Sequence, residues 1–209
     1  MLLSKENSNF VRYFVMMRTL RYILLVVVTA LLCGFASCRR TYVPRPYGYY
    51  RIEIPDTTYQ LYDNPALPYL FEVSTNARVE PRTKPTERYW IDIRYPDFDV
   101  RIHGSYLPVN GNLRELGDDA QNFVYKHAGK ASAIPEQGYD NADERVYGVF
   151  YELQGNTASP YQFYLTDSLH HFFRGAVYVN CVPNQDSLQP VIDYLQYDVR
   201  HLMESFRFR

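Results

Sequence analysis

The sequence has few cysteines, a single tryptophan and almost no net charge. It has 209 residues, of which three are Cys and one is Trp, and its formal net charge is −1. So few cysteines exclude a disulfide-rich miniprotein, and the missing basic excess argues against a general nucleic-acid binder. The chain also lacks the Gly-x-Gly-x-x-Gly and Gly-Lys-Ser/Thr patterns of phosphate-binding loops.

Aromatic residues are what the chain has in excess. There are 21 Tyr and 12 Phe, within a composition that is 46% hydrophobic and 22% charged. These proportions are typical of a globular chain and not of a disordered one. The length fits one domain, or one domain with a targeting segment.

An uncharged stretch near the N-terminus predicts an export signal. Residues 22–35 read YILLVVVTALLCGF, which is shorter than the ~20 apolar residues that a membrane-spanning helix needs. Two arginines precede this stretch and small residues follow it, in the order typical of a secretory signal peptide. We therefore expect residues 1–37 to be removed as a signal peptide, and Met16 or Met17 to be the true start.

The end of this signal resembles a lipobox. Phe35-Ala36-Ser37-Cys38 places a cysteine directly after small residues, as in the lipobox of bacterial lipoproteins. The resemblance implies that the Cys38 thiol takes a diacylglycerol and that cleavage occurs before it. Cys38 would then be the acylated first residue, carrying chains such as palmitate. The alternative is a plain N-terminal anchor helix in which Cys38 is incidental.

Lipidation at Cys38 would fix the mature protein to a membrane of the cell envelope. Several acyl chains hold a protein stably, whereas a single chain holds it only marginally. Residues 38–48 would then form a lipidated tether, in which Pro44 and Pro46 favour extended structure. No acidic cluster follows Cys38, and such a cluster accompanies surface export in relatives from Bacteroides-like bacteria. We therefore expect the protein to face the periplasm.

Residues 49–209 are expected to form a single α+β domain. Alternation between apolar and polar residues with period two, bounded by Pro, Gly, Asn and Asp, predicts strands. The predicted strands are Tyr49–Ile54, Tyr69–Ser74, Tyr89–Tyr95, Phe98–Leu107, Glu144–Leu153, Tyr161–Thr166 and Phe172–Cys181. Short connections favour antiparallel hairpins, and hence an antiparallel sheet of about six strands.

Two helices are expected to pack on this sheet. Apolar residues recur at three- and four-residue spacing over Leu113–His127 and, more strongly, over Asp186–Phe206. Sequential antiparallel strands with helices on the sheet are typical of an α+β fold. The element order resembles the PsbP-like fold, a curved antiparallel sheet with a long C-terminal helix.

Catalytic and metal-binding patterns find little support in the sequence. Gly104-Ser105 lies at the end of a strand without a nucleophile elbow, and His103 beside it is expected to point to the opposite face. His170-His171 is the most tempting metal pair, but a hairpin edge with one histidine exposed is the favoured explanation. We predict that the protein is not an enzyme and holds no metal and no cofactor.

Tyrosines and one arginine supply the best candidate for a binding surface. One face of the predicted strands is apolar, and the other carries Tyr147, Tyr151, Tyr164, Arg174 and Tyr178. Because Tyr and Arg are enriched in the cores of protein–protein interfaces, these five residues are the predicted interaction face. The alternative is that the second predicted helix, Asp186–Phe206, covers them, with each phenol reaching a partner at the edge.

Two segments have an unusual order of aromatic, Arg and Pro residues. They are residues 44–55, PRPYGYYRIEIP, and residues 174–205, RGAVYVNCVPNQDSLQPVIDYLQYDVRHLMES. These segments resemble the gliding motility lipoprotein GldD family of Bacteroidota, and the lipobox, the tether and the stretch YWIDIRYPDFDVRIHGSYLPV fit the same family. The resemblance runs from about residue 39 to the end. It implies a role in gliding motility and in type IX protein secretion, with no established catalytic residues.

The sequence thus predicts a periplasm-facing lipoprotein that supports the motility and secretion machinery by non-enzymatic protein–protein interaction. Its predicted partners are the membrane, through acylated Cys38, and envelope proteins of that machinery, but no nucleic acid. The alternative is an envelope carrier that binds a small apolar or lipid ligand between sheet and helix. A third hypothesis is a hydrolase whose site the sequence does not display.

Overall fold

The computed structural model describes residues 16–29, 54–126, 128–180 and 185–209. Its contacts divide the chain into two units, Met1–Gly48 and Tyr49–Arg209. In the first unit residues 16–29 form a helix. Within the described residues, no helix is both long and apolar enough to cross a membrane. The predicted cleavage site, Cys38 and the tether lie outside the described residues.

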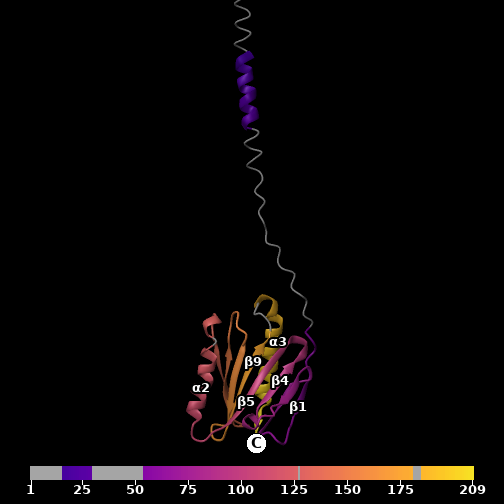
Figure 1. Cartoon of the computed structure of the whole chain (residues 1–209), viewed down its shortest axis with the longest axis vertical. Coiled ribbons are helices and arrows are strands. Elements are labelled where there is room, and N and C mark those ends of the chain that lie inside the picture. Colours follow the sequence, from indigo (N-terminus) through magenta and orange to yellow (C-terminus); the bar gives the residue numbers. More distant parts are fainter. Residues whose placement is uncertain (1–15, 30–53, 127, 181–184) are drawn as a thin grey trace, which may run out of the picture. The chain divides into compact units, whose positions relative to one another are not determined.

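A seven-stranded sheet forms the centre of the second unit (Figure 1). Its strand order is β3-β4-β5-β9-β8-β7-β6, and all neighbouring strands run antiparallel. The strands are β3 (Arg78–Pro81), β4 (Ile91–Tyr95), β5 (Val100–Pro108), β6 (Glu136–Asn141), β7 (Val146–Glu152), β8 (Tyr161–Thr166) and β9 (His171–Val179). Along β5, Val100, Ile102 and Tyr106 are buried, whereas Arg101, His103 and Ser105 are partly exposed, so one face is more deeply buried than the other.

A small sheet and the long C-terminal helix pack on the buried face. The small sheet has the order β1-β2-β10, and its strands are β1 (Tyr59–Tyr62), β2 (Tyr69–Ser74) and β10 (Arg207–Phe208). The helix is α3 (Gln185–Ser205). Tyr69 and Phe71 of β2, Ile93 of β4 and Leu195 of α3 belong to one hydrophobic core. The two sheets and α3 therefore share a single core.

Aromatic rings fill the centre of this core. The fully buried ring of Phe206, just after α3, lies 4.9 Å from the ring of Phe173 and 5.3 Å from that of Tyr69, centroid to centroid. Such pairs contribute about 0.5–1.5 kcal/mol beyond the burial of their surface. Gly175 gives the rings room, because a Cβ atom at this position would lie 2.2 Å from the ring of Phe163.

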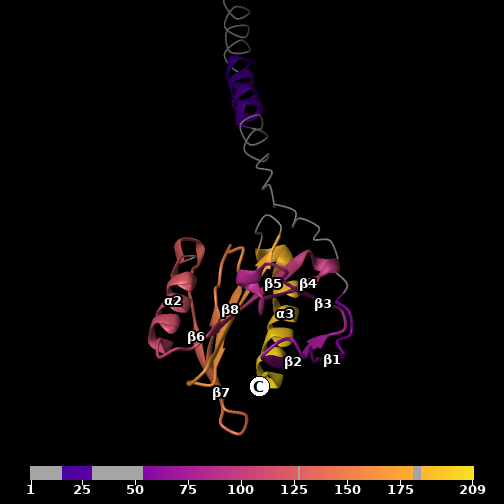
Figure 2. The ribbon, with the colours of Figure 1, turned by 60° about the horizontal axis from the view of Figure 1, so that its bottom comes forward.

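The other helix of the domain, α2 (Leu113–Tyr125), covers part of the opposite face. Ala120 of α2 shares a cluster with Phe172 of β9, and Val124 shares a cluster with Tyr151 of β7. Figure 2 shows α2 and α3 on opposite sides of the sheet. The part of this face over β4 and β5 lies beside α2 and carries polar side chains.

The α+β class is confirmed, with both domain helices where the apolar spacing predicted them. Helix α2 begins at Leu113 as expected, while its predicted last residue, His127, lies outside the described residues. The six predicted strands from Tyr69 onward are present, with bounds that differ from the prediction by two residues at most. The first predicted strand, Tyr49–Ile54, lies outside the described residues except for Ile54.

The strand count exceeds the prediction. Strands β1, β3, β6 and β10 were not predicted, and the strands form one sheet of seven and one of three, where the sequence suggested a single sheet of about six. Short 3₁₀ helices lie at Pro85–Glu87, Pro96–Phe98 and Ala128–Lys130. The Pro96–Phe98 turn matters most for the site, because it sets the register of the β4–β5 hairpin.

Candidate functional site

Three of the five predicted interface residues pack against α2. Tyr151 is 3% exposed and shares a cluster with Val124 of α2, and Tyr164 packs against the same cluster. The guanidinium carbon of Arg174 lies 4.3 Å from the centroid of the Phe123 ring on α2. Burial raises the pKa of Tyr164 and lowers the pKa of Arg174, as expected when a helix shields polar groups from water.

A helix thus covers the face around Tyr151, Tyr164 and Arg174, as in the alternative, but it is the first predicted helix, α2, and not the second. Tyr147 and Tyr178 are partly exposed, on β7 and β9. An interaction through all five residues stays a prediction. The open part of the face lies at Tyr178, on the side of β4 and β5.

Strand register aligns charged side chains in two rows across this open part. In one row Arg94 of β4 lies opposite Arg101 of β5, which in turn lies opposite Tyr178 of β9. In the next row Asp92 of β4 lies opposite His103 of β5. Side chains directly opposite each other on neighbouring strands are close enough to interact. The register thus brings together groups that stand far apart in the sequence.

Asp92 is the centre of an ion-pair network. Its Oδ1 accepts a hydrogen bond from Arg82 Nη2 at 2.9 Å and lies 2.6 Å from His103 Nδ1, and its Oδ2 lies 3.7 Å from Arg101 Nη1. Only 7% of Asp92 is exposed. Burial alone would raise the pKa of this carboxyl group, but the hydrogen bonds from Arg82 and His103 outweigh burial and hold the pKa below its usual value.

Asp92 and His103 have the geometry of the acid and base of a hydrolase, a pairing that the sequence did not reveal. His103 and Ser105 also point to the same face, so the expectation that they diverge is wrong, because residues two apart on a strand share a face. The Ser105 hydroxyl, however, donates to the carbonyl oxygen of Arg174 at 3.4 Å. Its hydrogen bond is made to the backbone, whereas a catalytic serine is paired with the base.

A groove of about 550 Å³ opens beside the first row. We call it the arginine groove, and it is lined by Arg94, Tyr95, Pro96, Asp99, Val100, Arg101, His103, Ala158, Tyr178, Val179 and Asn180. Asn180 Nδ2 donates to Asp99 Oδ2 at 2.9 Å, which ties the end of β9 to the β4–β5 turn. Guanidinium, phenol and amide groups supply the hydrogen-bond donors along the groove. Binding is therefore the chemistry that this groove is equipped for.

His170 and His171 lie at the edge of a hairpin. The side chain of His170 is 74% exposed, and His171 Nδ1 lies 2.7 Å from the hydroxyl of Tyr106. Asp167 Oδ1 accepts hydrogen bonds from the backbone N–H groups of both histidines at 2.8 Å, which closes the turn. Across the described ranges, no three or more His, Cys, Asp or Glu side chains are grouped to hold a metal ion.

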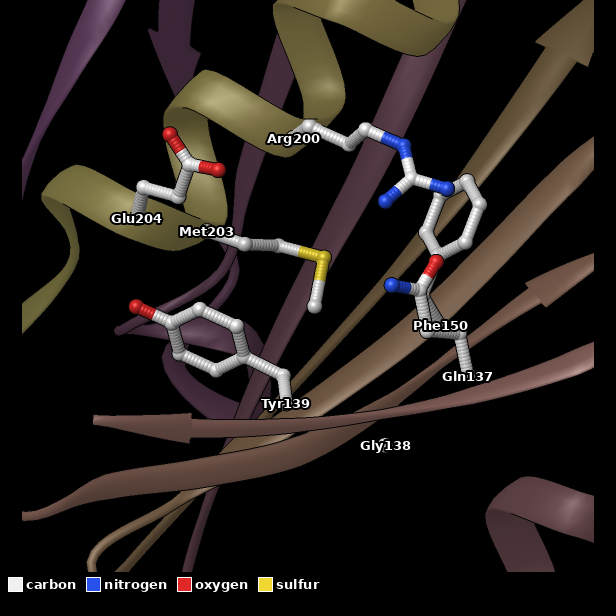
Figure 3. Close-up of a pocket in the computed structure, with 7 residues that line it drawn as sticks. All are labelled: Gln137, Gly138, Tyr139, Phe150, Arg200, Met203 and Glu204. Atoms are coloured by element: carbon white, nitrogen blue, oxygen red, sulfur yellow. The ribbon is translucent and has the colours of Figure 1, made fainter. Parts of the chain in front are cut away.

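A small pocket between the large sheet and α3 bears on the carrier alternative (Figure 3). It is lined by Gln137, Gly138, Tyr139, Phe150, Arg200, Met203 and Glu204. Its volume is about 30 Å³, enough for a water molecule but far below the ~300 Å³ of a small-ligand site. Arg200 lies over Phe150, with its guanidinium carbon 4.8 Å from the ring centroid. Side chains thus fill most of the space between sheet and helix at this pocket, which does not favour a lipid carrier.

A buried carboxyl group on α3 joins the small sheet to the core. Asp198 is 4% exposed, and its Oδ1 accepts a hydrogen bond from the hydroxyl of Tyr59 on β1 at 3.0 Å. Burial raises the pKa of Asp198 above its usual value, although the hydrogen bond from Tyr59 acts in the opposite direction. Asp198 lies on the far side of the sheet from the arginine groove, so we assign it to packing of the fold.

Comparison with known proteins finds a family and a solved structure. A sequence model of the family described as gliding motility lipoprotein GldD matches residues 39–208. The solution structure of cyanobacterial PsbP (CyanoP) from Synechocystis sp. PCC 6803 is similar at 12% sequence identity and a TM-score of 0.44, covering 79% of this chain and 100% of that one. No curated protein matches the sequence.

Proposed function

Because the chain belongs to the gliding motility lipoprotein GldD family, we propose that it supports the gliding motility and type IX secretion machinery through protein–protein contacts. In this proposal the protein is anchored by acyl chains on Cys38, faces the periplasm and catalyses no reaction. The family match carries the proposal, because it spans residues 39–208 and so includes all but the first residue of the predicted tether and all but the last residue of the domain.

The anchor follows from the sequence around Cys38. Small residues stand before this cysteine and an apolar run precedes them, and the matched family is described as a family of lipoproteins. Acyl chains on the first residue hold a protein at a membrane, and a proline-containing tether keeps its domain at some distance from the lipid. Such a protein meets its partners in the plane of one membrane, where lateral diffusion brings them together.

A binding role suits the chemistry of the domain. Asp92 and His103 form an acid–base pair on the open face. Arg82 holds this pair in an ion-pair network. The neighbouring serine hydroxyl is hydrogen-bonded to the backbone. The arginine groove, in contrast, presents donors and aromatic surface of the kind found where proteins meet. These observations support contact with a partner over turnover of a substrate.

A gene deletion with complementation tests this proposal. We expect deletion in the native bacterium to abolish colony spreading, where the organism glides, and secretion of type IX cargo, and the wild-type gene to restore both. Cys38→Ala should lose metabolic labelling by radioactive palmitate and fail to complement. Cys181→Ala is the matched control and should keep labelling and function. Normal secretion and spreading in the deletion strain would refute the proposed function.

A further inference from the structure

We propose that the arginine groove binds an acidic segment of a partner protein, through carboxylates that pair with Arg94 and Arg101. This inference rests on the proposed function, because it names the chemistry of the partner that the function requires. The charges of the groove and the register of its strands support it.

The first step is an unfavourable pairing of like charges. Arg94 and Arg101 occupy directly opposite positions on β4 and β5. Like charges in such positions destabilise a sheet by roughly 0.2–1 kcal/mol. An anion bound between the two arginines would remove this repulsion. Binding would therefore recover the free energy that the repulsion costs the free protein.

The second step is that the internal partners of both arginines are weak. Arg94 Nη1 lies 3.4 Å from Glu80 Oε1, and about half of each side chain is exposed, at 45% and 50%. Arg101 Nη1 lies 3.7 Å from Asp92 Oδ2. The exposed pair of Arg94 with Glu80 contributes about 0–1 kcal/mol and exchanges readily for an incoming carboxylate, and the Arg101 contact is longer than a hydrogen bond.

The third step is that Asp92 is already engaged by stronger contacts. Arg82 and His103 approach its Oδ1 at 2.9 Å and 2.6 Å, so the contact with Arg101 is the longest of the three. Arg101 can therefore turn toward a ligand while Asp92 keeps two partners. The side chain of Arg101 is 42% exposed, which leaves its guanidinium group accessible from the groove.

The rest of the lining favours a protein segment. Tyr178 lies opposite Arg101, and the exposed Pro96 adds apolar surface at the β4 end of the groove. Tyrosine and arginine are the residue types that most often carry the binding energy of protein interfaces. A groove of about 550 Å³ has room for several side chains of an extended segment.

The charges around the groove favour a carboxylate over a phosphate. Glu80 and Asp92 already contact the two arginines, and Asp99 lies in the lining itself. These acids offset much of the attraction that the arginines exert on an anion. Arginine pairs equally well in geometry with carboxylate and phosphate, but a dianion loses more hydration energy on binding, so the weakened attraction favours the carboxylate.

A peptide-binding experiment tests the inference. The full-length protein in detergent micelles is titrated against a fluorescein-labelled peptide of Glu and Gly, and against its twin of Gln and Gly, with fluorescence anisotropy as the readout. We expect the Glu peptide to bind about tenfold tighter or more, the size of one charge-assisted hydrogen bond. Equal affinity for the two peptides would overturn the inference.

Variants locate the binding in the groove. R94Q/R101Q should lose about tenfold or more in affinity for the Glu peptide, and R94E/R101E should bind a Lys-Gly peptide in its place. Arg114→Gln is the matched control, because this arginine on α2 has a side chain that is 96% exposed, and its affinity should stay at the wild-type value. Thermal unfolding checks that each variant is folded. Unchanged affinity in R94Q/R101Q would overturn the inference.

Competition and complementation separate the remaining outcomes. Displacement of the Glu peptide by inorganic phosphate or by phosphatidylglycerol vesicles, at lower concentrations than acetate requires, would overturn the carboxylate assignment in favour of phosphate. In the deletion strain, we expect R94Q/R101Q to fail where Arg114→Gln complements. Full complementation by R94Q/R101Q would overturn the groove as the partner site and leave the proposed function standing. A deletion strain without any defect would overturn the proposed function itself.

Discussion

Arg94 and Arg101 lie directly opposite each other on neighbouring strands, on the face of the sheet that α3 does not cover. A pair of like charges in this position weakens the sheet and offers a site for an anion. We interpret it as a place where stability is given up for binding, because each arginine has a partner within the chain only at 3.4 Å or beyond.

The first prediction concerns the stability of Arg94→Gln. The substitution removes the exposed contact with Glu80, worth about 0–1 kcal/mol, and relieves a repulsion of similar size. We expect the free energy of unfolding in urea at low salt to change by less than about 0.5 kcal/mol. Arg82→Gln should in contrast lower the free energy of unfolding by about 1–3 kcal/mol, because the buried Asp92 then loses the hydrogen bond that it accepts from Arg82. A larger loss for Arg94→Gln than for Arg82→Gln would contradict this interpretation.

The second prediction concerns acid stability through Asp92. Its folded-state pKa lies below the usual value of 3.8, because hydrogen bonds from Arg82 and His103 outweigh burial. The stability that this group contributes is therefore fully present above about pH 4 and is lost as pH falls through the lowered pKa. We expect Asp92→Asn to be about 1–3 kcal/mol less stable than wild type at pH 7, with a gap that narrows below pH 4.

Urea unfolding from pH 7 to pH 2.5 measures this gap. The exposed Asp97→Asn serves as the control and should follow the wild-type curve. A gap for Asp92→Asn that widens toward low pH would show that the network does not favour the carboxylate form.

The third prediction has the opposite sign and concerns Asp198. Burial raises its folded-state pKa above the usual value, so the folded state favours the protonated form. The stability contributed by this group is present below about pH 4 and is lost as pH rises through the raised pKa. Asp198→Asn should not show this decline, so its stability relative to wild type should increase with pH above 4. Asp193→Asn, on the exposed side of α3, should show no such trend, and a trend of the same size there would assign the effect to surface charge.

The fourth prediction concerns the aromatic core. Gly175→Ala places a Cβ atom 2.2 Å from the ring of Phe163, which is 1% exposed and has little space to move. Overpacking of this kind costs about 1–3 kcal/mol, and chemical unfolding should show a loss in that range. Gly138→Ala is the matched control on β6, because no atom lies within 4 Å of its added Cβ. Equal stability of the two variants would mean that the core adapts at Gly175 without strain.

Much of the fold could be predicted because its central strands and both domain helices have one apolar side. Helix α3 was placed closely because burial on one face imposes a clear period. Strand β8 is buried on nearly all positions, and Pro160 and Asp167 marked its two ends in the sequence. Strands β3 and β6 were missed for the converse reason. Both are at the edges of the large sheet and are mostly exposed, so their strand structure depends on hydrogen bonds to β4 and β7 and leaves little apolar pattern.

The candidate site was harder to predict because it depends on the register of the strands and on which part of the sheet face a helix covers. Tyr151 and Tyr164 were assigned to the correct face, but a strand pattern does not say that α2 packs there. Asp92 and His103 pair only because the turn at Pro96–Phe98 aligns β4 with β5. The Pro96-Asp97 turn was visible in the sequence, and counting outward from it along both strands would have brought this pair together.

If both proposals hold, a protein of the motility and secretion machinery contacts the domain at the arginine groove. The most direct measurement replaces Tyr178, which lines this groove, with a photocrosslinking amino acid in living cells and identifies the adduct by mass spectrometry. We expect an adduct with an envelope component of that machinery, lost in the R94Q/R101Q background while the protein level stays normal. Adducts with lipid alone, or an unchanged protein adduct in that background, would contradict contact through this groove.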